Sequence, residues 1–402
     1  MMMKANSLHK AVGFVSLCLM ACTNDIPDIG QTNLEPSRIY LSAGVGKAMS
    51  SRSPYQPTDG NGNVLSYPTT AHPLDVSVWA STTSGVYPNS GLDGREGTVA
   101  IHTHASFQSG DPQLLGEAIY PKKPEGSDAP VPVYFIGLHP ESKDGSVWTT
   151  ATNENKGAQF TFKGKEDVMF APQIFGTYGI DYNSSPEFHF YHLLTWLRFE
   201  VVADKDETDV KKREAIAAAW GKIKTLTIKS KSKVTIPDVG IVEDESLVES
   251  VSYDNDMDMP LYKTASDDVY PESGGSVIPT KGIEEVAYVM CAPVTGVYKD
   301  ADEMVPEYTL HIETENRTLD IPVDLRIADI VDKNNDGVIS DEERKAAYFL
   351  ESTMGKQFTI LLNFKMGDVI SVATMISVGG ETDWFTHGTG NGDIREEDLV
   401  SE

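Results

Sequence analysis

The chain has 402 residues, with 60 acidic against 33 basic side chains and a formal net charge of −27 at pH 7. Because a surface of this sign repels phosphate backbones and anionic headgroups, the composition argues against a nucleic-acid-binding protein. At roughly 150 residues per domain, the length predicts two domains, or three.

The N-terminus has the pattern of a bacterial secretory leader. Lys4 and Lys10 precede a short apolar run, Ala11 to Met20, and Cys22 follows it. A cysteine directly behind such a run is the lipid acceptor of bacterial lipoproteins. We therefore expect residues 1–21 to be a signal peptide and Cys22 to carry the lipid, palmitate included. A transmembrane anchor is the alternative, but the run is shorter than the ~20 residues that span hydrocarbon.

Removal of the predicted leader determines which cysteines remain available for a disulfide. Cys18 lies in the signal peptide and Cys22 is the lipid acceptor, so only Cys291 would remain. No intrachain disulfide is then expected, and the domains must be held by apolar packing and hydrogen bonds. Residues 22–36 are polar and lack periodicity, which predicts a flexible lipidated tether.

Beyond the tether, the chain has the pattern of many short strands. Ile39, Leu41, Ala43 and Val45 alternate with polar or small residues, the period of a half-buried strand. Clusters rich in Gly, Asn and Asp, such as residues 59–63, separate the apolar runs as turns. The other predicted strands are Leu74–Ala80, Val131–Leu138, Ala158–Phe162, Leu226–Ile228, Ala287–Val294, Tyr308–Ile312, Phe358–Phe364 and Val369–Val378. The sequence thus predicts a mostly antiparallel, all-β protein.

Two segments have helical character. Within Thr208–Lys222, Val210, Ile216 and Trp220 can share one face, which predicts a helix that covers a sheet. Ser340–Ser352 opens with acidic residues, which the positive end of a helix dipole favours. Both helices are expected in the second half of the chain.

A turn-rich break near residues 183–186 is the expected domain boundary. Short strands at regular spacing favour two β-sandwiches in tandem, over residues 37–183 and 184–385. Residues 386–402 are acidic and contain glycines, which predicts a flexible tail.

Residues 332–343 fit the calcium-loop pattern D-x-[DN]-x-[DN]-G-x5-E at every defined position. Calcium takes six to eight oxygen ligands, and the sequence offers them at the expected spacing. The predicted ligands are the side chains of Asp332, Asn334 and Asp336, the carbonyl of Val338, Ser340 directly or through water, and bidentate Glu343. The loop has no second, paired loop, and the entering segment 325–330 fits a strand as well as a helix. We therefore expect a weak structural Ca²⁺ site in an EF-hand-like loop inserted in the second domain; an acidic surface loop that matches by chance is the alternative.

Motifs for catalysis are missing from the sequence. It contains no G-x-S-x-G, H-E-x-x-H or P-loop, and no G-x-G-x-x-G after a strand. Carboxylate pairs are so frequent in this acidic chain that none marks a glycosidase dyad. His102 and His104 lack a further nearby Cys or His for zinc, and His189 and His192 are expected to pack or cap. We expect no enzymatic activity.

Several segments share features with one family of surface proteins. They are Arg38–Val45 followed by Ser50–Ser53, Phe188–Leu194 with Leu197 and Phe199, Phe358–Phe364, Val369–Val378, and Trp384 with Gly388–Gly392. Together they resemble the fimbrillin family, the pilin lipoproteins of type V pili. The resemblance spans most of the mature chain, although each motif alone is weak.

The resemblance implies two transthyretin-like β-sandwiches in a surface-exposed lipoprotein of the outer membrane. It also implies cleavage after an arginine, withdrawal of an N-terminal strand, and filling of the groove by a strand from the next subunit. Arg52 is the predicted cleavage site, because cutting there would free Ile39–Val45. Cleavage after Arg38 is one alternative and would leave that strand in place; the other is that both are ordinary surface arginines.

We therefore expect a structural or adhesive subunit of a cell-surface fimbrium, assembled by strand exchange. Its expected partners are other pilin subunits, the outer membrane through the lipid, and ligands on host or bacterial surfaces. The calcium-type loop and the acidic tail depart from a plain stalk pilin, so tip, stalk and anchor positions are all open. The alternative function is a surface glycan-binding lipoprotein that holds sugars on exposed aromatic rings of a calcium-stabilised β-sandwich; a hydrolase ranks last.

Overall fold

The computed structural model describes thirteen main stretches of the chain. These are residues 38–45, 73–82, 102–108, 111–120, 129–142, 148–150, 157–178, 185–237, 251–294 without 265, 298–304 without 301–302, 308–323, 353–367 without 356, and 370–376, with positions 68, 70, 84, 125 and 126. The chain divides into two compact units, residues 1–35 and 36–402, and every described residue belongs to the second. Over these stretches, no helix has the length and apolar character needed to cross a membrane.

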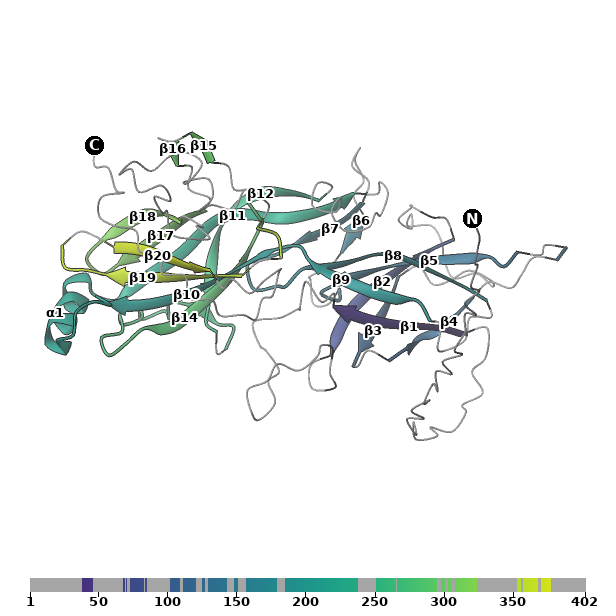
Figure 1. Ribbon diagram of the computed structural model, residues 1–402, viewed down its shortest axis with the longest axis horizontal. Helices are drawn as coiled ribbons and strands as arrows, with labels where there is room; N and C mark the ends of the chain where they lie inside the picture. The colour runs from purple at the N-terminus through teal and green to yellow at the C-terminus, as the bar shows by residue number, and fades with distance from the viewer. Residues whose placement is uncertain are drawn as a thin grey trace, which may run out of the picture. The chain divides into compact units, whose positions relative to one another are not determined.

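The first sheet has seven strands (Figure 1). They are β1 (Arg38–Val45), β2 (Leu74–Ser81), β3 (His102–Phe107), β4 (Gln113–Ile119), β5 (Pro132–His139), β8 (Met169–Thr177) and β9 (Glu187–His192). Their order is β3-β2-β5-β8-β9-β1-β4, and all neighbours are antiparallel except β1 and β9. All seven contribute buried side chains to a single apolar cluster, so the sheet curls around its own core.

The second sheet has eleven strands, ordered β18-β17-β11-β12-β14-β10-β19-β20, with β7 and β13 pairing to β11 and β12 and β6 pairing to β7. They are β6 (Thr149–Thr150), β7 (Gly157–Thr161), β10 (Thr195–Ala203), β11 (Ile223–Pro237), β12 (Ser252–Tyr262), β13 (Val269–Tyr270), β14 (Glu284–Cys291), β17 (Tyr308–Thr314), β18 (Thr318–Val323), β19 (Gln357–Phe364) and β20 (Ile370–Ile376). A separate pair joins β15 (Tyr298–Asp300) and β16 (Glu303–Met304). Strand β19, which lies between β10 and β20, is buried along its whole length and runs parallel to β10.

The helix α1 (Val210–Trp220) packs against β10 and β19, as expected for residues 208–222. Its N-cap Asp209 accepts a hydrogen bond from the backbone N–H of Lys211 at 2.9 Å. Gly221 ends the helix with φ +75°, where a residue with a side chain would be strained. Trp220 is buried, and its Nε1 donates to the carbonyl of Lys365 at 2.8 Å. The indole therefore fixes the helix to the end of β19.

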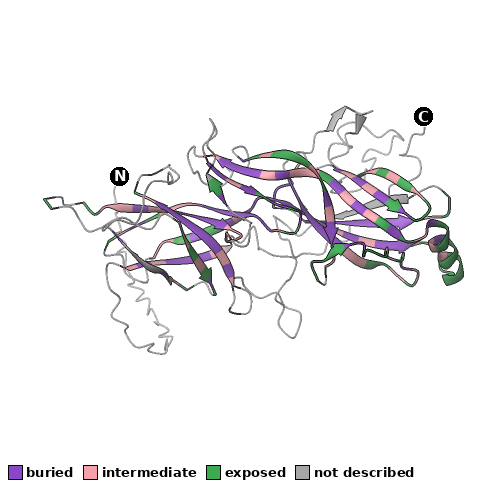
Figure 2. Cartoon of the chain, turned by 180° about the vertical axis from the view of Figure 1, so that it is seen from behind, coloured by how far each residue is buried: buried purple, intermediate pink, exposed green. Residues whose placement is uncertain are grey.

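The all-β prediction is confirmed for the described residues, and Figure 2 shows buried residues running along the strands of both sheets. The division into two transthyretin-like sandwiches stays a prediction. Of the expected boundary region 183–186, residues 183 and 184 lie outside the described residues, as does the predicted helix 340–352. Sheet membership changes at residues 193–194, between β9 and β10, while β6 and β7 from earlier in the chain join the second sheet.

Candidate functional site

Strand β1 changes its pairing partner halfway along its length. Residues 38–41 lie antiparallel to residues 113–119 of β4, with an irregular register. Residues 42–45 lie parallel to residues 187–190 of β9. In these registers no residue of β1 has a strand on both sides, so β1 spans the seam between two strand edges. Without β1, the hydrogen-bonding groups of both edges would be exposed.

The side of β1 that faces the core is fully buried. Ile39, Leu41 and Ala43 each have 0% exposed surface and belong to the apolar cluster of the first sheet. The same cluster contains Phe188 and Phe190 of β9, whose ring centroids are 5.7 Å apart. Alternate side chains of β1 therefore fill the core while its backbone completes the sheet, which is the arrangement of an inserted strand.

Close packing restricts what fits in this seam. A Cβ atom at Gly44 would lie 3.0 Å from Oε1 of Glu187, so a side chain at position 44 would require the exposed Glu187 side chain to shift. Deeper in the core, a Cβ atom at Gly137 would lie 2.5 Å from the ring of Phe190. The Phe190 ring can occupy its position beside β1 because residue 137 of β5 has no side chain. The buried positions of β1 hold two large side chains and then a small one: Ile39, Leu41 and Ala43.

Tyr120, the residue directly after β4, is also part of this core. Its ring packs edge-on against Phe135, with centroids 6.3 Å apart. The hydroxyl is buried without a hydrogen-bond partner among the described residues, and burial raises the pKa of Tyr120 to about 12. A Cβ atom at Gly176 would lie 2.1 Å from this hydroxyl, so β8 also approaches closely through a glycine.

The residues predicted from sequence to act at the N-terminus lie largely outside the described stretches. Cys22 and the predicted cleavage site Arg52 both fall there. Arg38, the alternative cleavage site, is the first residue of β1 and lies opposite Ile119 of β4. Cleavage after Arg38 would leave the buried residues of β1 attached, as expected from the sequence.

The predicted calcium loop also lies outside the described residues. This holds for all six proposed ligands: Asp332, Asn334, Asp336, Val338, Ser340 and Glu343. Within the described part of the chain, no group of three His, Cys, Asp or Glu side chains is placed to hold a metal ion. The Ca²⁺ site therefore stays a prediction.

The histidines singled out from the sequence take separate positions. His104 of β3 forms an ion pair with Glu141, with Nδ1 and Oε1 3.2 Å apart. His192 of β9 is fully buried, and its Nδ1 lies 2.8 Å from Oδ1 of the buried Asp167. His189 lies on the opposite, exposed side of β9. Sequence reasoning missed Asp167, because nothing near it in the chain marks it as the partner of a distant histidine.

A second imidazole, which is partly buried, lies near this pair. His139 of β5 and His192 of β9 both lie opposite Met169 of β8. Nδ1 of His139 is 2.8 Å from the carbonyl oxygen of Asp75. Burial lowers the pKa of His139, and the negative charge of Asp167 acts in the opposite direction. The two imidazoles thus have separate hydrogen-bond partners, the carboxylate of Asp167 for His192 and the backbone carbonyl of Asp75 for His139.

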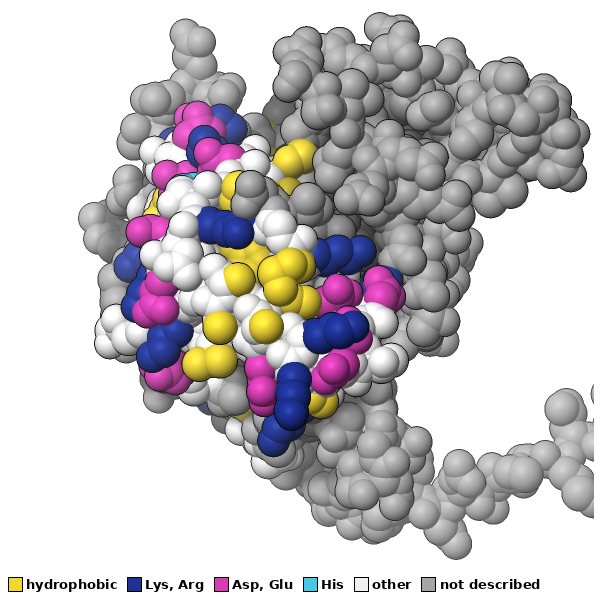
Figure 3. Space-filling view, turned by 90° about the vertical axis from the view of Figure 1, so that its left-hand side faces the viewer, with side chains coloured by type: hydrophobic (Ala, Val, Ile, Leu, Met, Phe, Trp, Pro, Cys, Tyr) yellow, Lys and Arg dark blue, Asp and Glu magenta, His cyan; other side chains and the backbone are white. Residues whose placement is uncertain are grey.

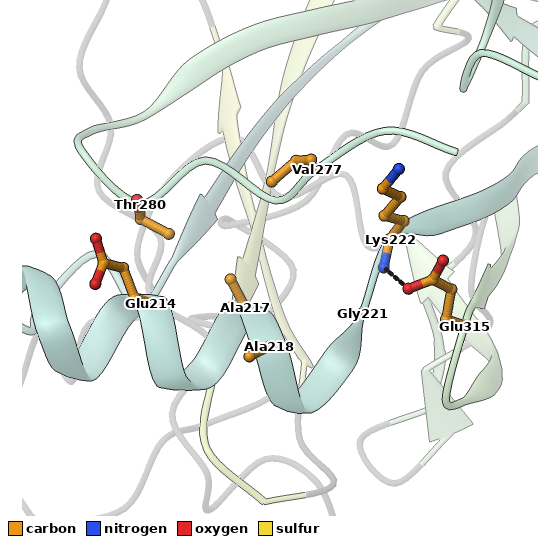
Figure 4. A pocket seen from close by; sticks show the side chains of 8 residues that line it. All are labelled: Glu214, Ala217, Ala218, Gly221, Lys222, Val277, Thr280 and Glu315. Atoms are coloured by element: carbon orange, nitrogen blue, oxygen red, sulfur yellow. Dashed lines mark hydrogen bonds between the residues drawn. The ribbon is translucent and has the colours of Figure 1, made fainter. Parts of the chain in front are cut away.

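A shallow pocket of about 420 Å³ lies between α1 and the segment that follows β13 (Figure 4). Ala217 of the helix points toward Val277 across it, and Ala218 is a further lining residue. At one end, the backbone N–H of Lys222 donates to Oε2 of Glu315 at 3.1 Å. The lining residues include no serine, cysteine or histidine. Figure 3 shows the face that carries α1, where hydrophobic side chains gather among charged groups of both signs.

Comparison with known proteins gives likeness of structure only. No protein-family model and no curated protein sequence matches the chain. Among solved structures, the fimbrial anchor protein Mfa2 of Porphyromonas gingivalis is 11% identical, with a TM-score of 0.36 over 84% of this chain and 97% of that one. A fimbrial assembly protein of Parabacteroides distasonis is 9% identical, with a TM-score of 0.36 over 84% and 94%. A proposed cell-adhesion protein of Bacteroides ovatus is 12% identical, with a TM-score of 0.40 over 87% and 99%. All three similarities are distant, with identities of 12% or less and TM-scores of 0.40 or less.

Proposed function

We propose that the chain is a structural or adhesive subunit of a cell-surface fimbrium of the type V kind, assembled by strand exchange at the position of β1. Removal of β1 after N-terminal processing would open the seam between β4 and β9. A strand from another subunit would then take its place and complete the sheet by β-augmentation. The partners are therefore other pilin subunits and, for an adhesive member, ligands on host or bacterial surfaces.

The pairing of β1 is the observation that carries this proposal. The strand comes first among the described elements, yet it lies inside the sheet between two strands from later in the chain. Burial of Ile39 and Leu41 stabilises the fold by ~1.5–3 kcal/mol each. An incoming strand of the same pattern would restore this burial and the backbone hydrogen bonds, so exchange would cost little at equilibrium.

The remaining parts of the proposal concern the anchor, the metal and the fold class. Until cleavage after Arg52, lipid on Cys22 would hold the chain in the outer membrane, with residues 22–36 as the tether. A Ca²⁺ ion bound by residues 332–343 would stabilise the second half of the chain without a catalytic role. We propose that each curled sheet is a transthyretin-like sandwich and that the chain performs no catalysis.

Limited proteolysis tests the processing step. The chain without its leader is treated with an arginine-specific protease, the new N-terminus is sequenced, and detergent-resistant ladders are sought on gels over a range of protein concentrations. Cleavage after Arg52 followed by ladders is expected. Arg52→Gln should block both, whereas Arg38→Gln serves as the matched control and should leave both unchanged.

Two results would contradict the proposal. Ladders that form equally in uncleaved protein would show that assembly does not require release of β1. Cleaved protein that has lost β1 and stays monomeric at every concentration would show that the open seam does not accept a second strand.

A further inference from the structure

The outer side of the first sheet carries an apolar strip where a polar surface is expected. In β5, Val133 and Phe135 face the core and are 0% exposed, so Tyr134 between them faces outward. Its cross-strand partner is Phe175 of β8, which is 61% exposed. A phenylalanine has no polar atom that gains from contact with water, so this exposure is unfavourable in the isolated chain.

The two rings form a continuous platform. Their centroids are 6.0 Å apart and their planes are inclined by 44°. The next cross-strand pair on the same side is Pro132 opposite Thr177, which extends the strip along the strands by one further apolar ring. Since β5 and β8 are hydrogen-bonded neighbours in the sheet (Figure 1), the backbone holds this surface in shape.

Hydroxyl and amide groups lie beside the platform among the described residues. Ser81 of β2 lies opposite Tyr134 on the other side of β5. Ser84 donates a hydrogen bond of 3.0 Å to Oε1 of Gln173, which orients that amide beside Phe175. In a chain of net charge −27, these side chains contribute rings, hydroxyls and an amide and no carboxylate. This set suits a ligand with apolar faces and hydroxyl edges and without charge.

We propose that this platform, with Tyr134 and Phe175 at its centre, binds neutral carbohydrate. The face of a pyranose ring presents C–H groups, which are attracted to the negative face of an aromatic ring, while its equatorial hydroxyls hydrogen-bond to neighbouring amide and hydroxyl groups. Two rings in a row match successive sugars of a polysaccharide chain. Polyanionic polysaccharides are disfavoured by the charge of the protein.

Affinity gel electrophoresis of the mature chain tests the proposal. The gels contain hydroxyethyl cellulose, arabinoxylan, galactomannan or amylopectin, and a sulfated polysaccharide serves as the charged comparison. Migration should be retarded by at least one neutral polymer and not by the sulfated one. Phe175→Leu, which keeps an apolar side chain but removes the ring, should weaken binding by about tenfold. Phe175→Tyr should retain binding.

Val277→Ala is the matched control, since Val277 is 67% exposed and lies outside the platform. It should bind as the unaltered chain does, and thermal melting should confirm that all variants are folded. Absence of retardation by all four neutral polymers would overturn the proposal. Equal binding by Phe175→Leu and the unaltered chain would also overturn it, because ring stacking would then not be the source of affinity.

Discussion

Substitution of Leu41 by alanine tests whether β1 leaves the sheet as a separate unit. Leu41 is 0% exposed within the core of the first sheet. Replacing a buried leucine by alanine costs about 2–5 kcal/mol, through lost burial and the cavity left behind. If β1 opens while the rest of the fold persists, this whole cost appears in the local opening of the strand.

Hydrogen exchange of the backbone amides of residues 38–45 measures that opening. Each 1.4 kcal/mol changes an equilibrium tenfold, so Leu41→Ala should speed exchange by at least about 30-fold. Leu310→Ala is the matched control, because Leu310 is also 0% exposed but belongs to the core of the second sheet. It should lower global stability by a similar amount and leave exchange in β1 unchanged.

Equal acceleration of β1 exchange by both substitutions would refute the reasoning. It would mean that β1 is released only when the whole molecule unfolds. The strand would then be an ordinary part of the core, and its irregular pairing would have no bearing on assembly.

Three further predictions concern the calcium loop, His139 and the lipid. Calorimetric titration with Ca²⁺ should release heat from the unaltered chain and much less from Glu343→Gln; identical heats would contradict a metal site in residues 332–343. Burial lowers the pKa of His139 in the folded chain below its usual 6.5. Between the folded and the unfolded pKa, the unfolded chain therefore binds more protons than the folded chain. The contribution of His139 to stability is thus fully present above pH 6.5 and is lost as the pH drops below that value. His139→Gln should flatten this fall in urea midpoint between about pH 8 and pH 5, and equal slopes in both proteins would argue against the assignment. Cys22→Ser, expressed with its leader, should move the protein from the membrane fraction to the soluble fraction; retention in the membrane would contradict lipidation of Cys22.

The sequence predicted β1 well, because its alternation reflects a strand with one buried side. Ile39, Leu41 and Ala43 are the residues that the pattern marked and the structure buries. The pairing of β1 was not predictable, since β4 and β9 lie far along the chain and nothing in the sequence near β1 indicates which strands it pairs with. The buried side of β1 can thus be predicted from the sequence. Its position between the edges of β4 and β9 is known only from the sheet topology.

The run from Phe188 to Val202 shows a different limit. It has the pattern of one apolar segment, yet it forms β9 and β10, which belong to different sheets. The break falls at Leu193 and Leu194, which are fully buried and carry no turn signal. The N–H of Leu193 donates a hydrogen bond of 2.8 Å to the carbonyl oxygen of Val168. This contact with a distant part of the chain holds the break between β9 and β10 in place.

Strand β12 was missed because aspartate and asparagine are poor strand formers. Its acidic residues lie opposite lysines of β11, with Lys229 facing Asp258, Lys231 facing Asp256 and Lys233 facing Asp254. Nζ of Lys231 is 2.7 Å from Oδ1 of Asp256. The alternating lysines and alternating acids were visible in the sequence, but only their antiparallel register turns them into a cross-strand ladder.

A disulfide that locks β1 to β9 tests strand exchange most directly. Ser42 lies opposite Glu187 in the parallel register, so cysteines at both positions can be joined. The background is the mature chain with Cys22→Ser, in which the native Cys291 is fully buried. After arginine-specific cleavage, the oxidised double-cysteine variant should stay monomeric, and reduction should restore detergent-resistant ladders. Ladders of equal strength in the oxidised and reduced forms would show that β1 need not leave the sheet for subunits to assemble.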